Sequence, residues 1–162
     1  MSHDLVIADK LKDECGVFGI WGPGENVSRL TYFGLHALQH RGQESAGIAV
    51  TDGKQISVYK GMVLVTEVFN DTILNNLNGS AAVGHVRYST IGTSSLINAQ
   101  PLVFRCRRGS AAFAHNGNLV NAAQLEGQLA EMGVLFQSTS DTEIFANLVA
   151  RYGEKGIVAA VK

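Results

Sequence analysis

The sequence has little proline, little cysteine and few charged residues for its length. Its 162 residues include two prolines and two cysteines, and 17% of them are charged, against a usual charged fraction of about 25%. The scarcity of proline and the lack of any low-complexity tract leave no obvious linker, so we expect a single domain. A net charge of −1 provides no basic surface of the kind that nucleic-acid-binding proteins carry.

The sequence also lacks a long apolar run. No stretch reaches the ~18 residues that a membrane span requires, and the mixed-charge residues 1–14 do not have the pattern of a signal peptide. We therefore expect a cytoplasmic protein that binds neither a membrane nor nucleic acid. Cys15 and Cys106 would then be free thiols, and because neither belongs to a paired ligand motif, no metal site is predicted.

The sequence consists mainly of short apolar runs separated by glycine-containing turns, and 18 of its residues are glycine. We expect antiparallel strand pairs joined at Asp52-Gly53 and Arg108-Gly109, and helices that occur in groups. This order predicts an α+β domain with helices packed on antiparallel sheets. The predicted strands cover residues 16–21, 46–52, 54–61, 81–90, 102–108, 110–117 and 134–137, and the predicted helices cover 26–39, 119–133 and 142–153, with a short helix toward residue 77.

Four polar clusters interrupt these apolar segments, each at a strand end or in the loop that follows. They are Cys15 and residues 85–90, 114–119 and 138–143. Polar groups that converge at strand ends commonly form a binding or catalytic site. Cys15 itself is either a small packing residue at the head of a buried strand or a nucleophile.

Each of the other clusters has two interpretations. Arg87 suits a carboxylate ligand, or it is a surface residue at a strand end. Asn116 and Gly117 could direct an amide and a backbone N–H at a developing oxyanion, or they form a turn whose neighbour Asn118 caps the next helix. Asp141 either binds an ammonium group or is an ordinary acidic residue of a helix start.

Taken together, the clusters indicate one reaction. A thiol nucleophile, oxyanion donors, an arginine for a carboxylate and an aspartate for an ammonium group describe hydrolysis of a side-chain amide on a zwitterionic amino acid. Glutamine is the substrate that fits. The residues offer no general base, because no histidine lies in an evident triad. Arg41 and Gly42 lie between a helix and a strand, where a solvated helix end is the alternative.

Six segments carry a resemblance to a known family: ECGVFGIW, LQHRGQESAGIAV, GHVRYSTIG, NAQPL, AHNGNLVNA and SDTEIF. These motifs resemble the N-terminal glutaminase domains of the amidophosphoribosyltransferase family, which are class II glutamine amidotransferases within the N-terminal-nucleophile hydrolases. They extend from Cys15 to about Phe145 and so cover most of the chain. Relatives that make glucosamine phosphate have RGYDSAG and HTRWATHG, whereas this chain has RGQESAG and HVRYSTIG, which argues against another amidotransferase.

The resemblance implies the missing base. Residues 1–14 would be a propeptide removed by self-cleavage, and residues 15–162 an incomplete glutaminase domain with a truncated C-terminal end. Cys15 would then be both the nucleophile and the carrier of the base, its own α-amino group. An α-amino pKa of about 7.7–8.0 suits that task near neutral pH.

The resemblance also implies roles for the other candidates. Asn116 and Gly117 would stabilise the oxyanion, and Asp141 would bind the α-ammonium group of glutamine. Arg87, with the loop at Thr90, would bind the substrate carboxylate. A further stretch, residues 41–42 (Arg41 and Gly42), would position the terminal cysteine and cover the glutamine. The implied fold is a four-layer α/β/β/α sandwich.

The longer family members imply partners that this chain does not include. In them, ammonia passes to a C-terminal phosphoribosyltransferase domain, absent here, and reacts with magnesium-bound phosphoribosyl pyrophosphate. The product is 5-phosphoribosylamine, at the first committed step of purine synthesis. Some members carry an iron–sulfur cluster and the full-length proteins form homo-oligomers, but Cys15 and Cys106 alone cannot supply the cluster ligands, so no cofactor is expected in this chain. The alternative is a silent or unprocessed fragment that keeps only the fold or an interaction surface.

Overall fold

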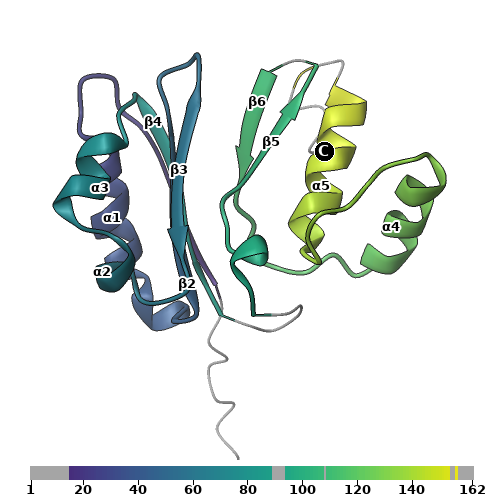
Figure 1. The fold of residues 1–162 in the computed structure, drawn as a ribbon, viewed down its shortest axis with the longest axis horizontal. Helices are drawn as coiled ribbons and strands as arrows, with labels where there is room; N and C mark the ends of the chain where they lie inside the picture. Colours follow the sequence, from purple (N-terminus) through teal and green to yellow (C-terminus); the bar gives the residue numbers. More distant parts are fainter. Residues whose placement is uncertain (1–14, 89–93, 108, 154–155, 157–162) are drawn as a thin grey trace, which may run out of the picture.

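In the computed structural model of the 162-residue chain, residues 15–88, 94–107, 109–153 and 156 are described (Figure 1). The predicted propeptide, residues 1–14, and Thr90 lie outside this part. The elements in chain order are β1 (Gly16–Trp21), α1 (Val27–Ala37), the 3-10 turn η1 (Gln39–Arg41), β2 (Ser45–Thr51), β3 (Ile56–Gly61), α2 (Val65–Val68), α3 (Asp71–Asn76), β4 (Ala81–Arg87), the 3-10 turn η2 (Leu96–Asn98), β5 (Leu102–Cys106), β6 (Gly109–Phe113), α4 (Ala122–Glu131) and α5 (Asp141–Tyr152).

The strands form two antiparallel sheets. One has four strands in the order β1-β4-β2-β3, and the other is the hairpin β5-β6. Figure 1 shows α1, α2 and α3 on the outer side of the four-stranded sheet, and α4 and α5 on the far side of the hairpin. The layers follow one another in the order helices, sheet, sheet, helices, and the predicted α+β class is confirmed.

The core lies between α1 and the four-stranded sheet. Leu35 of α1 and Ile48 and Val86 of the sheet are fully buried. Helix and sheet approach closely because β4 has a glycine beneath the helix. A Cβ on Gly84 would lie 2.6 Å from the Thr31 side chain, so any larger residue there would push the helix away.

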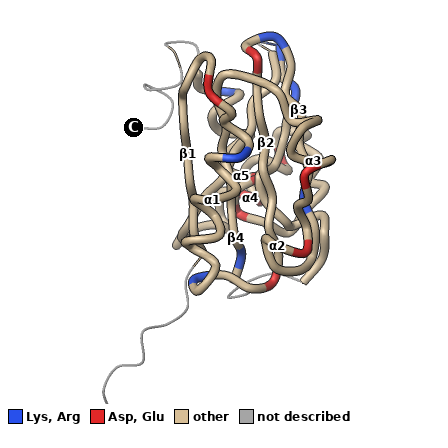
Figure 2. Tube along the Cα trace, turned by 90° about the vertical axis from the view of Figure 1, so that its left-hand side faces the viewer, with Lys and Arg blue, Asp and Glu red and all other residues tan. Residues whose placement is uncertain are grey.

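Charged residues lie outside this core. Figure 2 shows acidic and basic residues interspersed over the helices and strand ends, while β1 and β2 carry none. None of the helices in the described parts of the chain is long and apolar enough to cross a membrane.

The turn predicted at Asp52-Gly53 is confirmed. Thr51 pairs with Ile56 across the hairpin, and Gly53 has a φ of 89°, a region that glycine adopts without strain. The Asp52 carboxylate accepts the backbone N–H groups of Lys54 and Gln55 at 2.8 Å each. In the second hairpin, β6 begins at Gly109, and the preceding Arg108 lies outside the described residues.

The strand predicted over residues 134–137 is wrong, because this segment is irregular. Its backbone donors have other partners: Val134 N donates to Leu129 O at 3.0 Å and so closes the end of α4. Gln137 N donates to the buried Glu143 carboxylate at 3.0 Å. The apolar side chains also lack a common interior face, since Leu135 is 88% exposed.

Candidate active site

Cys15 lies directly before β1 and is held through its backbone carbonyl. The Asn116 amide donates to Cys15 O at 2.6 Å, and Arg41 Nε donates to the same oxygen at 3.2 Å. The donors come from the loop after β6 and from the turn after α1, so segments far apart in the sequence fix this residue. Its side chain is partly exposed and can be reached by a small molecule.

The Cys15 thiol faces the end of β4. Because Gly16 of β1 lies opposite Val86 of β4, Cys15 falls at the level of Arg87, the last residue of β4, and its thiol reaches Tyr88, the next residue. Tyr88 N donates to Sγ at 3.4 Å, and Sγ lies 3.5 Å from Tyr88 O. The sulfur is therefore placed by strand register.

Arg87 is the last residue of β4 and is buried, with only 8% of its side chain exposed. Its guanidinium lies 3.4 Å from the Glu44 carboxylate, and Glu44 N donates to Arg87 O at 3.0 Å. Gly42 packs against the same strand end, where an added Cβ would lie 2.7 Å from the backbone carbonyl carbons of Val86 and Arg87. The stretch containing Arg41 and Gly42 thus contacts both Cys15 and the strand end at Arg87.

Asp141 is the first residue of α5, after Ser140 at the N-cap, whose hydroxyl accepts Thr142 N at 3.3 Å. It is therefore a first-turn acidic residue, where the helix dipole favours negative charge. Its carboxylate also faces the loop after β6. There it accepts Leu119 N at 2.9 Å and lies 3.7 Å from His115 Nδ1.

The loop with Asn116 and Gly117 is held at the residue before it. Gln100 Oε1 accepts His115 N at 2.7 Å, and His85 Nε2 lies 3.2 Å from His115 O. Gly117 has a φ of 141°, which a residue with a side chain rarely adopts. The alternative in which Asn118 caps the next helix is wrong, because α4 begins at Ala122 with Asn121 at its N-cap.

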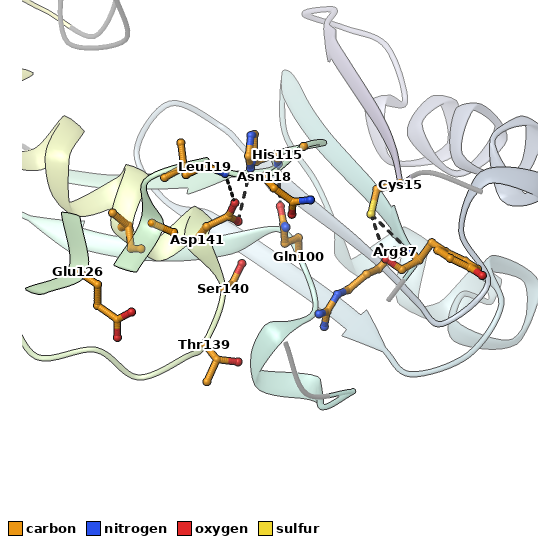
Figure 3. A pocket seen from close by; sticks show the side chains of 14 residues that line it. Cys15, Arg87, Gln100, His115, Asn118, Leu119, Glu126, Thr139, Ser140 and Asp141 are labelled. Atoms are coloured by element: carbon orange, nitrogen blue, oxygen red, sulfur yellow. Dashed lines mark hydrogen bonds and ion pairs between the residues drawn. The ribbon is translucent and has the colours of Figure 1, made fainter. Parts of the chain in front are cut away.

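These groups surround one cavity of ≈ 120 Å³ (Figure 3). Four predicted site residues line it: Cys15, Arg87, Gly117 and Asp141. Its size suits a small polar molecule, since drug-sized ligands occupy sites of about 300 Å³ or more.

Three predicted residues lie beside the cavity without forming its wall. Asn116 and Arg41 contact the Cys15 carbonyl, and Gly42 packs under β4. Thr90 lies outside the described residues.

Other residues that line the cavity were not predicted to be site residues. Most of them belong to the family motifs quoted above, and this membership was the available signal. Thr139 belongs only to the polar cluster 138–143, and Glu126 of α4 belongs to neither. They are Tyr88, Gln100, His115, Asn118, Leu119, Ala122, Glu126, Thr139, Ser140 and Ile144.

Opposite charges lie at separate parts of the cavity wall. The Arg87 guanidinium lies on the side of Cys15, and the carboxylates of Asp141 and Glu126 lie farther along (Figure 3). This arrangement complements a ligand that carries both charges. Within the described ranges, no group of three or more His, Cys, Asp or Glu side chains is placed to hold a metal ion.

Comparison with known proteins identifies the family. Residues 70–161 match the model of the glutamine amidotransferase domain. The chain belongs to the glutamine amidotransferase domain family.

The amidotransferase domain is similar to the N-terminal parts of longer proteins. It is 55% identical over 144 residues to amidophosphoribosyltransferase of Bacillus subtilis, covering 88% of this chain and 30% of that protein. Its identity to the Synechocystis enzyme is 54% over 150 residues, covering 92% and 30%. The resemblance inferred from the motifs is confirmed, and the chain spans about 30% of the length of these relatives.

Two solved structures share its fold. The structure of the allosteric regulatory enzyme of purine biosynthesis matches with a TM-score of 0.83 and 51% identity, over 90% of this chain and 31% of the other. Glutamine phosphoribosylpyrophosphate amidotransferase from B. subtilis, complexed with ADP and GMP, matches with a TM-score of 0.81 at the same identity and coverage.

Proposed function

We propose that this domain hydrolyses the side-chain amide of glutamine, with Cys15 as the nucleophile. The observation that carries the proposal is the meeting of Cys15, Arg87 and Asp141 around one cavity, with the Asn116 amide at the Cys15 backbone. The Cys15 sulfur attacks the amide carbon, and the carbon–nitrogen bond breaks. Ammonia departs, and a thioester between Cys15 and the glutamyl group remains. Water then cleaves the thioester, giving glutamate and the free thiol.

The base in this scheme is the α-amino group of Cys15 after removal of residues 1–14. While residue 14 is attached, the Cys15 nitrogen is an amide, which cannot accept a proton. As a free amine it takes the proton from the thiol and then delivers it to the leaving nitrogen. The two donors that hold Cys15 O would keep this new terminus in place.

The charges on the cavity wall support one orientation of glutamine. Its α-carboxylate pairs with Arg87, assisted by the loop at Thr90, and its α-ammonium group pairs with Asp141. The side-chain amide then points toward Cys15. Asn116 has two amide N–H donors, of which Cys15 O uses one, and the second joins Gly117 N–H as the oxyanion site. Arg41 and Gly42 position the terminal cysteine and help to cover the substrate.

We assign the chain to the N-terminal-nucleophile hydrolase sandwich, α/β/β/α, on the order of its layers. In a full-length protein, a following phosphoribosyltransferase domain would combine the ammonia with magnesium-bound phosphoribosyl pyrophosphate to give 5-phosphoribosylamine, at the entry to purine synthesis. That protein would be a cytoplasmic homo-oligomer. High identity to amidophosphoribosyltransferases over most of this chain supports the assignment.

The test compares chains with defined N-termini. Purified protein is incubated with glutamine, glutamate release is followed, and intact mass defines the first residue. We expect release only from material that begins at Cys15, and a Cys15→Ser variant should lose nearly all of it. Release from material that keeps residues 1–14 would contradict the amine mechanism. A folded, fully processed chain without turnover would instead be a silent fragment.

A further inference from the structure

We propose that His85 and Gln100 are positioning residues that clamp the backbone of His115 and thereby set the place of the oxyanion donors. His85 Nε2 lies 3.2 Å from His115 O, and Gln100 Oε1 accepts His115 N at 2.7 Å. Both backbone groups of one residue are thus held by side chains. The next two residues are Asn116 and Gly117, so this clamp fixes the start of the loop that carries them.

His85 is suited to a fixed contact. It is fully buried, with 0% of its surface exposed. Because a carbonyl oxygen only accepts hydrogen bonds, Nε2 must carry the hydrogen, and Nδ1 has no hydrogen-bond partner among the described residues. Burial lowers the pKa of His85 to about 4, helped by the nearby Arg87 charge. The ring therefore stays neutral near pH 7 and acts as a constant donor.

Gln100 is anchored on the same face of the sheet as the His85 side chain, because Gly47, which it contacts, lies opposite His85. It is buried, with 6% exposed, and its backbone oxygen would lie 2.2 Å from a Cβ placed on Gly47 of β2. The glycine allows this close approach, so Gln100 rests on the four-stranded sheet that also contains His85. The clamped residue follows β6 of the other sheet.

The clamp therefore holds two parts of the site in a fixed position relative to each other. Arg87 lies on β4, two residues after His85, and Cys15 lies beside β4, whereas Asn116 and Gly117 follow the hairpin strand β6. Oxyanion donors act on the transition state. A loop displaced by about 1 Å can lower turnover by about 10²-fold, while glutamine binding at Arg87 and Asp141 is retained.

The kinetic test rests on the proposed glutaminase function and uses paired variants of the processed chain. His85→Leu removes the donor, and His85→Gln keeps an N–H near the Nε2 position. Gln100→Leu removes the acceptor, and Gln100→Glu keeps one. We expect the leucine variants to lose about 10²-fold in kcat with KM nearly unchanged, and the polar variants to recover most of it. Val50→Ala, a core truncation in β2, controls for lost stability.

A second measurement does not depend on turnover. Hydrogen exchange of the backbone N–H groups of Asn116 and Gly117 should be faster in His85→Leu and Gln100→Leu than in Val50→Ala at matched stability. Unchanged exchange, or a kcat loss equal to that of the control, would overturn the clamp. An inactive wild-type chain would refute the proposed function alone, because the exchange comparison still decides the clamp.

Discussion

At the scale of single residues, the polar side chains of the site have partners before any ligand binds. Arg87 lies beside Glu44, Asp141 accepts Leu119 N, and the Asn116 amide donates to Cys15 O. These contacts hold each group in one orientation, which reduces the conformational entropy lost on binding. Glutamine would therefore add contacts to oriented groups, and their geometry is set by the fold.

His85 gives the domain a pH dependence of stability. Its pKa is lowered to about 4 in the folded state by burial and by the Arg87 and His115 charges, although its hydrogen bond to His115 O opposes the shift. An unfolded histidine has a pKa of about 6.5. Between these values the unfolded chain takes up a proton that the folded chain does not. The free energy of unfolding therefore falls as the pH is lowered from about 6.5 to about 4, and this contribution is constant above pH 6.5.

The measurement is urea unfolding of wild type and His85→Gln at pH 7.5 and pH 5. Because the variant lacks the titrating group, it should lose less stability on acidification, by about 2 kcal/mol. Carboxylates titrate in both proteins and cancel in the difference. Parallel losses would show that His85 does not keep a depressed pKa.

At the scale of elements, Gly42 decides how closely the segment after η1 approaches β4. We predict that Gly42→Ala forces the backbone at Arg87 to shift, because the new Cβ would lie 2.7 Å from backbone atoms. Overpacking of this kind lowers the free energy of unfolding by about 1–3 kcal/mol, and a displaced Arg87 should raise KM for glutamine.

Gly19 offers the matched control, since an added Cβ there meets nothing within 4 Å. Gly19→Ala, in the middle of β1, should leave stability unchanged or slightly raised. Chemical denaturation and glutaminase kinetics on both variants provide the comparison. Equal behaviour of the two alanines would mean that β4 tolerates displacement at this point.

The elements that the sequence predicted correctly are those whose limits depend on neighbouring residues. Strand β1 and helix α5 have a clear apolar pattern and local end signals, so their positions followed from neighbouring residues alone. The segment 134–137 is also apolar, but its N–H groups bond to Leu129 and to Glu143. Those partners are set by tertiary packing, which no local pattern contains.

Some residues of the candidate site could likewise be predicted from local sequence, and others could not. Cys15, Arg87 and Asp141 could be predicted to meet because each lies at the end of an element or in the loop beside it. The contacts of His85 and Gln100 could not, since a buried polar residue in a strand or loop gives no sign of which backbone it will hold. The helix-borne Glu126 was missed because an exposed acidic residue on a helix is ordinary.

At the scale of the whole molecule, the site joins two halves that otherwise pack as separate layers. Arg87 belongs to the four-stranded sheet, and Asp141 begins the helix beyond the hairpin. One glutamine bound to both would tie the halves together, so its binding energy should appear as stability of the entire domain. We predict that glutamine at 100 times its Kd raises the free energy of unfolding by about 2.7 kcal/mol.

This prediction is best measured in Cys15→Ser, begun at residue 15, so that the ligand is not consumed during unfolding. Hydrogen exchange should slow in β4 and in α5 together, because both ends of the ligand are held. Removing the charge at either end, in Arg87→Gln or Asp141→Asn, should abolish most of the stabilisation in both elements. Stabilisation that survives both substitutions would place glutamine elsewhere, whereas protection confined to one element would mean that the ligand contacts only one half.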